Sequence, residues 1–85
     1  MKYIFVDESW EDYQYWQKNN KNFVKKINAL LKDISRNPFS GLGKPELLKH
    51  KYKGYWSRRI DAEHHLIYTV RESEIWIVKC RFHYD

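Results

Sequence analysis

The sequence predicts an α+β fold in which two N-terminal helices pack on one side of a small, mostly antiparallel sheet. Three observations lead to this prediction. A β-rich run occupies residues 2–6, two apolar helical patterns lie between residues 7 and 37, and three strand-like runs follow Gly54. The expected order of elements is therefore β-α-α-β-β-β, and we expect residues 1–85 to form one domain with one modest core.

The first helix is expected to follow directly after the strand at residues 2–6. Asp7 or Ser9 would cap it, and Ser9 with Asp12 forms a weak capping-box pattern. Acidic residues crowd into its first turn, where the helix dipole favours negative charge. Aromatic rings recur every three residues at Trp10, Tyr13 and Trp16. Because this stripe shares its helix with the acids, we expect it to pack in the core.

The second helix is predicted from about Lys21, after a break at Asn19-Asn20, to Asn37-Pro38. The residue before a proline avoids the helical region, so the helix should end there. Its apolar residues follow the i, i+3, i+4, i+7 pattern and are Phe23, Val24, Ile27, Leu30, Leu31 and Ile34. The two helices should form an antiparallel hairpin whose apolar stripes face the sheet.

Residues 37–53 are the least regular stretch, because prolines and glycines recur through it. Within it, residues 43–49 carry one carboxylate and two ammonium groups. A solvated connector is one interpretation. A long loop in so small a domain is more often functional, which is the second interpretation.

Residues 55–60, 64–70 and 75–83 are predicted as strands that short turns join into two hairpins. Strict alternation in the last strand divides its side chains between two faces. The expected core-facing set is Trp76, Val78, Cys80 and Phe82. The opposite set turns from apolar to basic along the strand and is Ile75, Ile77, Lys79, Arg81 and His83. The basic end of this face is suited to binding an anion.

The register of the hairpins follows if their core-facing residues stay together. The pairs then expected are Val70 with Trp76, His65 with Arg81, and Arg59 with His65. Four side chains would share the face away from the core, namely Arg59, His65, Arg81 and His83. His50 and His64 receive no role and are expected at the surface or at a sheet edge.

Composition narrows the class of partner. Sixteen Lys and Arg against 11 Asp and Glu give a net charge of +5 and a pI near 9.4, and the bases gather at residues 44–59, Lys79 and Arg81. This favours a polyanionic partner, although a basic protein without a nucleic-acid role has the same charge. The single cysteine, Cys80, excludes an internal disulfide and is expected to be a buried apolar residue.

Other classes of protein are disfavoured. The four histidines match no zinc spacing, so we expect neither a metal nor another cofactor. No apolar run is long enough for a membrane helix and the N-terminus lacks a signal-peptide pattern, so a cytoplasmic location is expected.

The residue types on the basic face suit metal-independent cleavage of RNA. This reaction needs a base for the 2′-hydroxyl proton, an acid for the leaving 5′-oxygen and cations for the phosphoryl charge. Glu46 is the candidate base and His83 the candidate acid. The candidate cations are Arg59, Lys49 and Arg81, and Tyr84 is a candidate for stacking on a base or aligning a phosphate.

Nearly the whole chain resembles the YoeB toxins of bacterial toxin–antitoxin modules, within the RelE-like superfamily. The matching stretches run in order at the family's spacing. They are residues 8–13, 15–16, 24–28, 38–39, 43–46, 48–50, 56–60, 63–64 and 80–84.

The resemblance implies a ribosome-dependent endoribonuclease that cuts translated mRNA in the A site of the 70S ribosome. It also implies a YefM-like antitoxin that covers the site, and a homodimer. By residue, it implies that Glu46 is the general base and His83 the general acid, that Lys49 and Arg59 contact phosphate and that Tyr84 orients the substrate. Lys44, Arg58 and Arg81 are further candidates for substrate binding.

One position departs from the family pattern. His65 stands where the family typically has an arginine that stabilises the developing charge. Histidine is cationic over only part of the physiological range and lacks the bidentate fork of arginine. Either the other cations suffice, or His65 acts when protonated, or turnover is reduced.

Two other functions remain open from the sequence. ParE-like relatives share the architecture and poison DNA gyrase, and a plain RNA- or ribosome-binding module would block translation without cutting. Glu46 together with the His83-Tyr84 ending argues against the ParE-like alternative, because a gyrase binder has no evident need for an acid and a base, whereas the binding module remains open.

Overall fold

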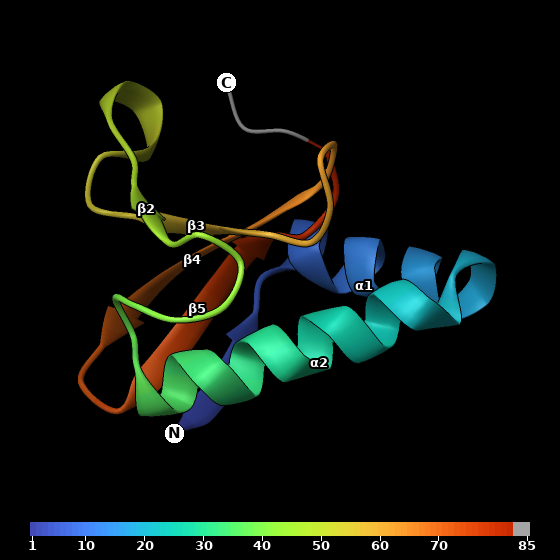
Figure 1. Cartoon of the computed structure of the whole chain (residues 1–85), viewed down its shortest axis with the longest axis horizontal. Helices are drawn as coiled ribbons and strands as arrows, with labels where there is room; N and C mark the ends of the chain where they lie inside the picture. The colour runs from blue at the N-terminus through green and yellow to red at the C-terminus, as the bar shows by residue number, and fades with distance from the viewer. Residues whose placement is uncertain (83–85) are drawn as a thin grey trace.

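The computed structural model describes residues 1–82, which form a five-stranded sheet with two helices on one of its faces (Figure 1). The strands are β1 (Lys2–Phe5), β2 (Glu46–Leu47), β3 (Trp56–Arg59), β4 (His65–Arg71) and β5 (Glu74–Lys79). The helices are α1 (Asp7–Asn19), α2 (Lys21–Arg36) and the short 3-10 helix η1 (His50–Tyr52). The predicted α+β fold is confirmed, and β2 and η1 are additions within the predicted loop.

The sheet is mixed, and its strand order is β1-β5-β4-β3-β2. β1 lies parallel to β5, whereas every other neighbouring pair is antiparallel. The chain therefore passes from one edge of the sheet through both helices to the other edge, and then fills the middle with β3, β4 and β5.

α1 begins without the predicted side-chain cap. Its N-cap residue is Val6, and no side chain accepts a hydrogen bond there. Ser9 lies in the first turn and is fully buried, where its hydroxyl donates to the Ile77 carbonyl at 2.6 Å. Ser9 thus ties α1 to β5 instead of capping the helix. Of the aromatic stripe, Trp16 is buried as expected, but Trp10 remains 46% exposed.

α2 has the predicted limits. The Asn20 side chain accepts a hydrogen bond from the Phe23 N–H at 3.2 Å, and the helix ends at Arg36 just before Asn37 and Pro38. Its apolar stripe packs against the sheet. The core cluster is Trp16, Ile27, Leu30, Leu31, Ile34, Ile60, Leu66, Tyr68, Ile75, Ile77 and Cys80. In the part of the chain that the structure describes, no helix has the length and apolar composition needed to span a membrane.

A β-bulge in β5 overturns the predicted faces of that strand. Val70 pairs with Ile75 and not with Trp76. The register then shifts, because Tyr68 pairs with Ile77 while its neighbour Ile67 pairs with Lys79. One extra residue, Val78, is therefore inserted in β5, and such an insertion advances the alternation of side chains by one position.

The inserted residue explains which face predictions failed. Ile75 and Ile77 are fully buried in the core, whereas Trp76 and Val78 are only half-buried. Beyond the bulge Cys80 returns to the core and is fully buried, as predicted. Burial raises the pKa of its thiol, so the neutral, unreactive form prevails.

The buried guanidinium of Arg58 fixes the loop after α2. Arg58 stands on β3, directly opposite Leu66, and points into the core side of the sheet with no exposed surface. Its Nε donates to the Tyr68 hydroxyl at 3.1 Å. The two terminal nitrogens donate to the Asp33 carboxylate at 2.6 Å and to the carbonyls of Leu42, Asn37 and Ser40 at 2.9, 2.6 and 2.9 Å.

Two partners of Arg58 reinforce this loop. Asp33 on α2 accepts the Leu42 N–H at 2.9 Å as well as the Arg58 guanidinium. The hydrogen bond with Arg58, which has the largest effect, and that with the Leu42 N–H lower the pKa of the Asp33 carboxyl. The Tyr68 hydroxyl donates to the Pro38 carbonyl at 2.7 Å, and burial raises its pKa so that it stays protonated. Arg58 has five N–H groups and makes five hydrogen bonds, so its hydrogen-bonding capacity is used within the fold.

We expect Leu31→Ala to lower the free energy of unfolding by about 2–5 kcal/mol, because Leu31 is a buried core residue on α2 and its loss leaves a cavity. Val78→Ala should cost clearly less, since Val78 is the half-buried bulge residue. Urea denaturation of both variants measures the difference. An equal or greater loss for Val78→Ala would contradict the observed placement of the core.

The lowered pKa of Asp33 predicts an acid-sensitive contribution to stability. As pH falls below about 4, the ordinary range of aspartate, the unfolded chain takes up the proton first, so the ion pair's contribution is lost. Asp33→Asn should be less stable than the wild type near neutral pH but should lose less stability across this acid window. The measurement is denaturant unfolding from pH 7 to pH 3, with Asp7→Asn as an exposed control. Identical pH slopes for wild type and Asp33→Asn would refute the assignment.

Candidate functional site

The face of the sheet that points away from α1 and α2, here called the outer face, carries a row of paired residues across four strands. Glu46 on β2 pairs with Ser57 on β3, Ser57 pairs with Ile67 on β4, and Ile67 pairs with Lys79 on β5. Residues directly opposite each other share a face. The carboxylate of Glu46 therefore begins a row that ends with the ammonium group of Lys79.

A second row on the outer face joins Arg59 and His65. These two residues pair directly, which confirms the predicted register. Arg59 lies two residues after Ser57 and His65 two residues before Ile67, so both belong to the face that carries Glu46. Arg59 is exposed and His65 is 5% exposed. Glu46, Arg59 and His65, three of the predicted site residues, are thus placed on one surface.

Gly43 brings the loop against the second row. Its carbonyl accepts the Arg59 N–H at 2.6 Å, and its φ is +78°. A Cβ at this position would lie 2.9 Å from the Leu30 side chain and 3.0 Å from the Arg59 carbonyl. Only glycine permits this approach, which sets the predicted substrate-binding Lys44 next to the Arg59 backbone.

Lys49 follows β2 and precedes η1, with its side chain exposed. It lines a shallow apolar hollow of about 390 Å³ together with Leu47, Leu48, His50, Lys53 and Gly54. Lys49 therefore lies on the edge of the sheet formed by β2, three residues beyond Glu46. His50 is exposed, as expected.

Two predicted substrate-binding arginines are engaged within the fold. Arg58 was expected to contact the substrate, but its guanidinium is fully buried and hydrogen-bonded to α2, Tyr68 and the loop, so that expectation is wrong. The burial of Arg58 follows from the predicted register, because neighbouring strand residues point to opposite faces. If Arg59 lies on the outer face, Arg58 lies on the core face. Arg81 is half-buried, with its guanidinium carbon 3.5 Å from the centre of the Tyr15 ring on α1. A substrate role for Arg81 stays a prediction.

The predicted acid, His83, and Tyr84 lie outside the described residues. The chain that leads to them is fixed beside the outer face, because the Phe82 carbonyl accepts the His65 N–H at 3.0 Å. His64 was expected at the surface or an edge, but it is 8% exposed and its Nδ1 accepts the Phe82 N–H at 2.7 Å. The family-like stretch at residues 63–64 included His64 but assigned it no role, since its partner is a backbone group far along the chain.

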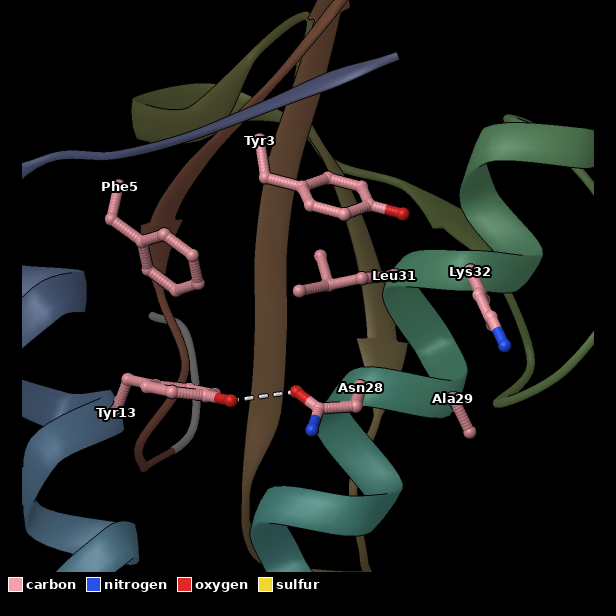
Figure 2. Close-up of a pocket in the computed structure, with 7 residues that line it drawn as sticks. All are labelled: Tyr3, Phe5, Tyr13, Asn28, Ala29, Leu31 and Lys32. Carbon is pink, nitrogen blue, oxygen red and sulfur yellow. Dashed lines mark hydrogen bonds between the residues drawn. The ribbon is translucent and has the colours of Figure 1, made fainter.

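A separate groove of about 510 Å³ lies on the helical side of the molecule (Figure 2). Tyr3 and Phe5 of β1 face Tyr13 of α1 and the side of α2 around Leu31, and the Tyr13 hydroxyl donates to the Asn28 side chain at 2.7 Å. None of the predicted site residues that lie within residues 1–82 lines it. Cavity volume alone therefore does not identify the charged outer face as the candidate site.

The chemistry available at the outer face is that of a carboxylate beside cations. Among residues 1–82, no group of three or more His, Cys, Asp or Glu side chains is arranged to hold a metal ion. Glu46 can accept a proton, while Lys44, Lys49 and Arg59 can bind anionic oxygens. A polyanion bound here would span both rows of the outer face.

Comparisons with known proteins agree with this architecture. A YoeB toxin of Escherichia coli strain K12 is 56% identical over 84 residues, covering 99% of this chain and 100% of the relative. The YoeB/ParE toxin from Agrobacterium tumefaciens superposes with a TM-score of 0.96 at 49% identity, over 99% of this chain and all of that one.

Two solved structures from Staphylococcus aureus are also similar over 99% of this chain and 98% of theirs. One is a YoeB–YefM complex, with a TM-score of 0.92 at 52% identity. The other is a YoeB dimer, with a TM-score of 0.93 at 50% identity. The family model for YoeB-like toxins of bacterial type II toxin–antitoxin systems matches residues 5–84. The chain therefore belongs to the YoeB-like family of bacterial toxins.

Proposed function

We propose that this toxin is a ribosome-dependent endoribonuclease that cuts translated mRNA in the A site of the 70S ribosome and thereby inhibits translation. One observation carries the proposal. Glu46, Arg59 and His65 share the outer face, and Phe82, the residue before His83, is hydrogen-bonded to His65. A candidate base, a cation and the approach to a candidate acid thus converge on one surface.

The proposed reaction needs no metal ion. Glu46 removes the proton from a 2′-hydroxyl, whose oxygen attacks the adjacent phosphorus. The bond from phosphorus to the 5′-oxygen breaks, and His83 protonates the departing oxygen. Lys44, Lys49 and Arg59 stabilise the charge on the phosphoryl oxygens, and Tyr84 orients the substrate. The products are a 2′,3′-cyclic phosphate, which can open to a 3′-phosphate, and a 5′-hydroxyl end.

The same proposal includes two protein partners. The Staphylococcus aureus relatives were solved as a complex with YefM and as a dimer. By analogy, a YefM-like antitoxin binds this chain and covers its outer face, and two toxin copies pair as a homodimer. A negatively charged antitoxin segment would complement the net charge of +5.

Primer extension on mRNA from translating ribosomes tests the proposal against its alternatives. Discrete breaks within codons support the nuclease. Stalled but intact message would instead indicate a ribosome-binding blocker. Unbroken message with gyrase-linked DNA breaks would indicate a ParE-like activity, an alternative motivated by the YoeB/ParE toxin of Agrobacterium tumefaciens.

We expect Glu46→Gln and His83→Gln each to reduce the cleavage rate by ~10²–10⁴-fold, the usual contribution of a general base or acid. Glu46 is exposed and outside the core cluster, so Glu46→Gln should unfold at the same urea concentration as the wild type. Glu11→Gln is the matched control, because Glu11 is an exposed glutamate on α1. A Glu46→Gln variant that cleaves as fast as Glu11→Gln would eliminate Glu46 as the base.

His65→Arg should raise cleavage, most visibly above neutral pH, because arginine stays charged where histidine does not. His65 pairs directly with Arg59, so the added charge should also destabilise the free protein, as like charges in opposed strand positions do. Single-turnover rates of wild type and variant across a range of pH measure the effect. An unchanged or lower rate for His65→Arg at about pH 8 would show that His65 is not a weakened substitute.

A further inference from the structure

We propose that His64 is a positioning residue, which holds the peptide of Phe82, the residue directly before the proposed acid His83, and thereby supports the proposed proton transfer. The inference rests on the proposed nuclease function and extends it to a residue that acts through Phe82 and does not itself take part in proton transfer. Its basis is a set of contacts that fixes the chain between the end of β5 and Phe82.

The first contacts come from α1. The Cys80 N–H donates to the Asp12 carboxylate at 3.0 Å, and the indole N–H of Trp16 donates to the Cys80 carbonyl at 2.8 Å. The guanidinium of Arg81 then lies on the Tyr15 ring, with 3.5 Å between its central carbon and the ring centre. Immediately after β5, successive residues are therefore attached to one helix.

The last contacts come from β4 and the residue before it. The Phe82 N–H donates to His64 Nδ1 at 2.7 Å, while the Phe82 carbonyl accepts the His65 N–H at 3.0 Å. Both backbone groups of Phe82 are thus held by two consecutive residues. The φ of Phe82 is +67°, a left-handed conformation that costs a non-glycine residue free energy and persists only where its surroundings impose it.

The imidazole of His64 is itself held in place. It packs edge-on to the Trp16 ring with 4.8 Å between ring centres, and edge-on to the Phe23 ring with 5.8 Å. Its own backbone N–H donates to the Asp61 carboxylate at 2.7 Å. Because Nδ1 accepts a hydrogen bond from Phe82, the ring proton resides on Nε2, which lies 3.5 Å from the Glu63 carboxylate.

These contacts give His64 a role that differs from ordinary core packing. An apolar ring at this position would fill the same space between Trp16 and Phe23, but it would leave the Phe82 N–H without its acceptor. The left-handed turn at Phe82 would then lose one of its two backbone restraints. A displacement of about 1 Å in a reacting group can lower a rate by about 10²-fold, so even slight freedom in this turn would reduce proton transfer from His83.

Three variants separate the acceptor from the ring. His64→Phe keeps an aromatic ring and removes the acceptor. His64→Asn removes the ring but keeps an oxygen close to the Nδ1 position, whereas His64→Gln carries its amide near the Nε2 position. We expect His64→Phe and His64→Gln to lower the single-turnover cleavage rate on mRNA-programmed ribosomes on the order of 10- to 100-fold. His64→Asn should retain more activity than either, and the toxin concentration for half-maximal rate should change little in all three.

A second readout follows the contact without catalysis. In the Glu46→Gln background, the exchange of the Phe82 amide proton with solvent should accelerate in His64→Phe and His64→Gln relative to His64→Asn. Equal rates and equal exchange in all three variants would overturn the proposal, as would a loss of activity in His64→Asn as large as in His64→Phe. If the parent protein cleaves no message, the nuclease function itself fails, whereas the amide exchange still reports whether His64 holds Phe82.

Discussion

The fold depends on one buried cation. Arg58 stands on a central strand pair, yet each hydrogen bond of its guanidinium reaches α2, Tyr68 or the segment from residue 37 to residue 42. A charge without exposed surface is tolerated only when it is paired and fully hydrogen-bonded, and Asp33 with the loop carbonyls meets both conditions. A loop rich in glycine and proline thereby acquires a defined path. That path ends at Gly43, against the backbone of Arg59.

The candidate site follows from this defined path and from the sheet register. Once the loop is held, the two-residue strand β2 can pair with β3, and this pairing sets Glu46 on the same surface as Arg59 and His65. The cations come from loop and strand positions with exposed side chains, where they can exchange water for phosphate oxygens. The other end of the site is approached by a chain segment that α1 and His64 secure. The helices therefore contribute to the proposed chemistry without carrying any of its groups.

The sequence predicted the helices well and the last strand poorly, for physical reasons. The apolar period of α2 and the proline after it mark both the buried face and the end of the helix. The pairing of Arg59 with His65 also followed from alternation, which placed these two site residues correctly relative to one another. In β5 the extra residue at Val78 leaves no local mark, so Ile75 and Ile77 were assigned to the wrong face. The roles of Arg58 and His64 were missed because their hydrogen-bond partners, which for Arg58 are Asp33, Tyr68 and three loop carbonyls and for His64 is the Phe82 N–H, are brought near only by the tertiary fold.

The position of β5 within the sheet has a consequence for how the molecule is made. β5 lies between β1 and β4, and Lys2 is paired with Glu74 across almost the whole sequence. Contacts so distant along a chain form late, because a long loop must close before they stabilise anything. A nascent chain that ends before residue 74 lacks the strand on which both neighbours depend. During synthesis, then, the helical hairpin can form early, but a complete sheet requires nearly the full polypeptide.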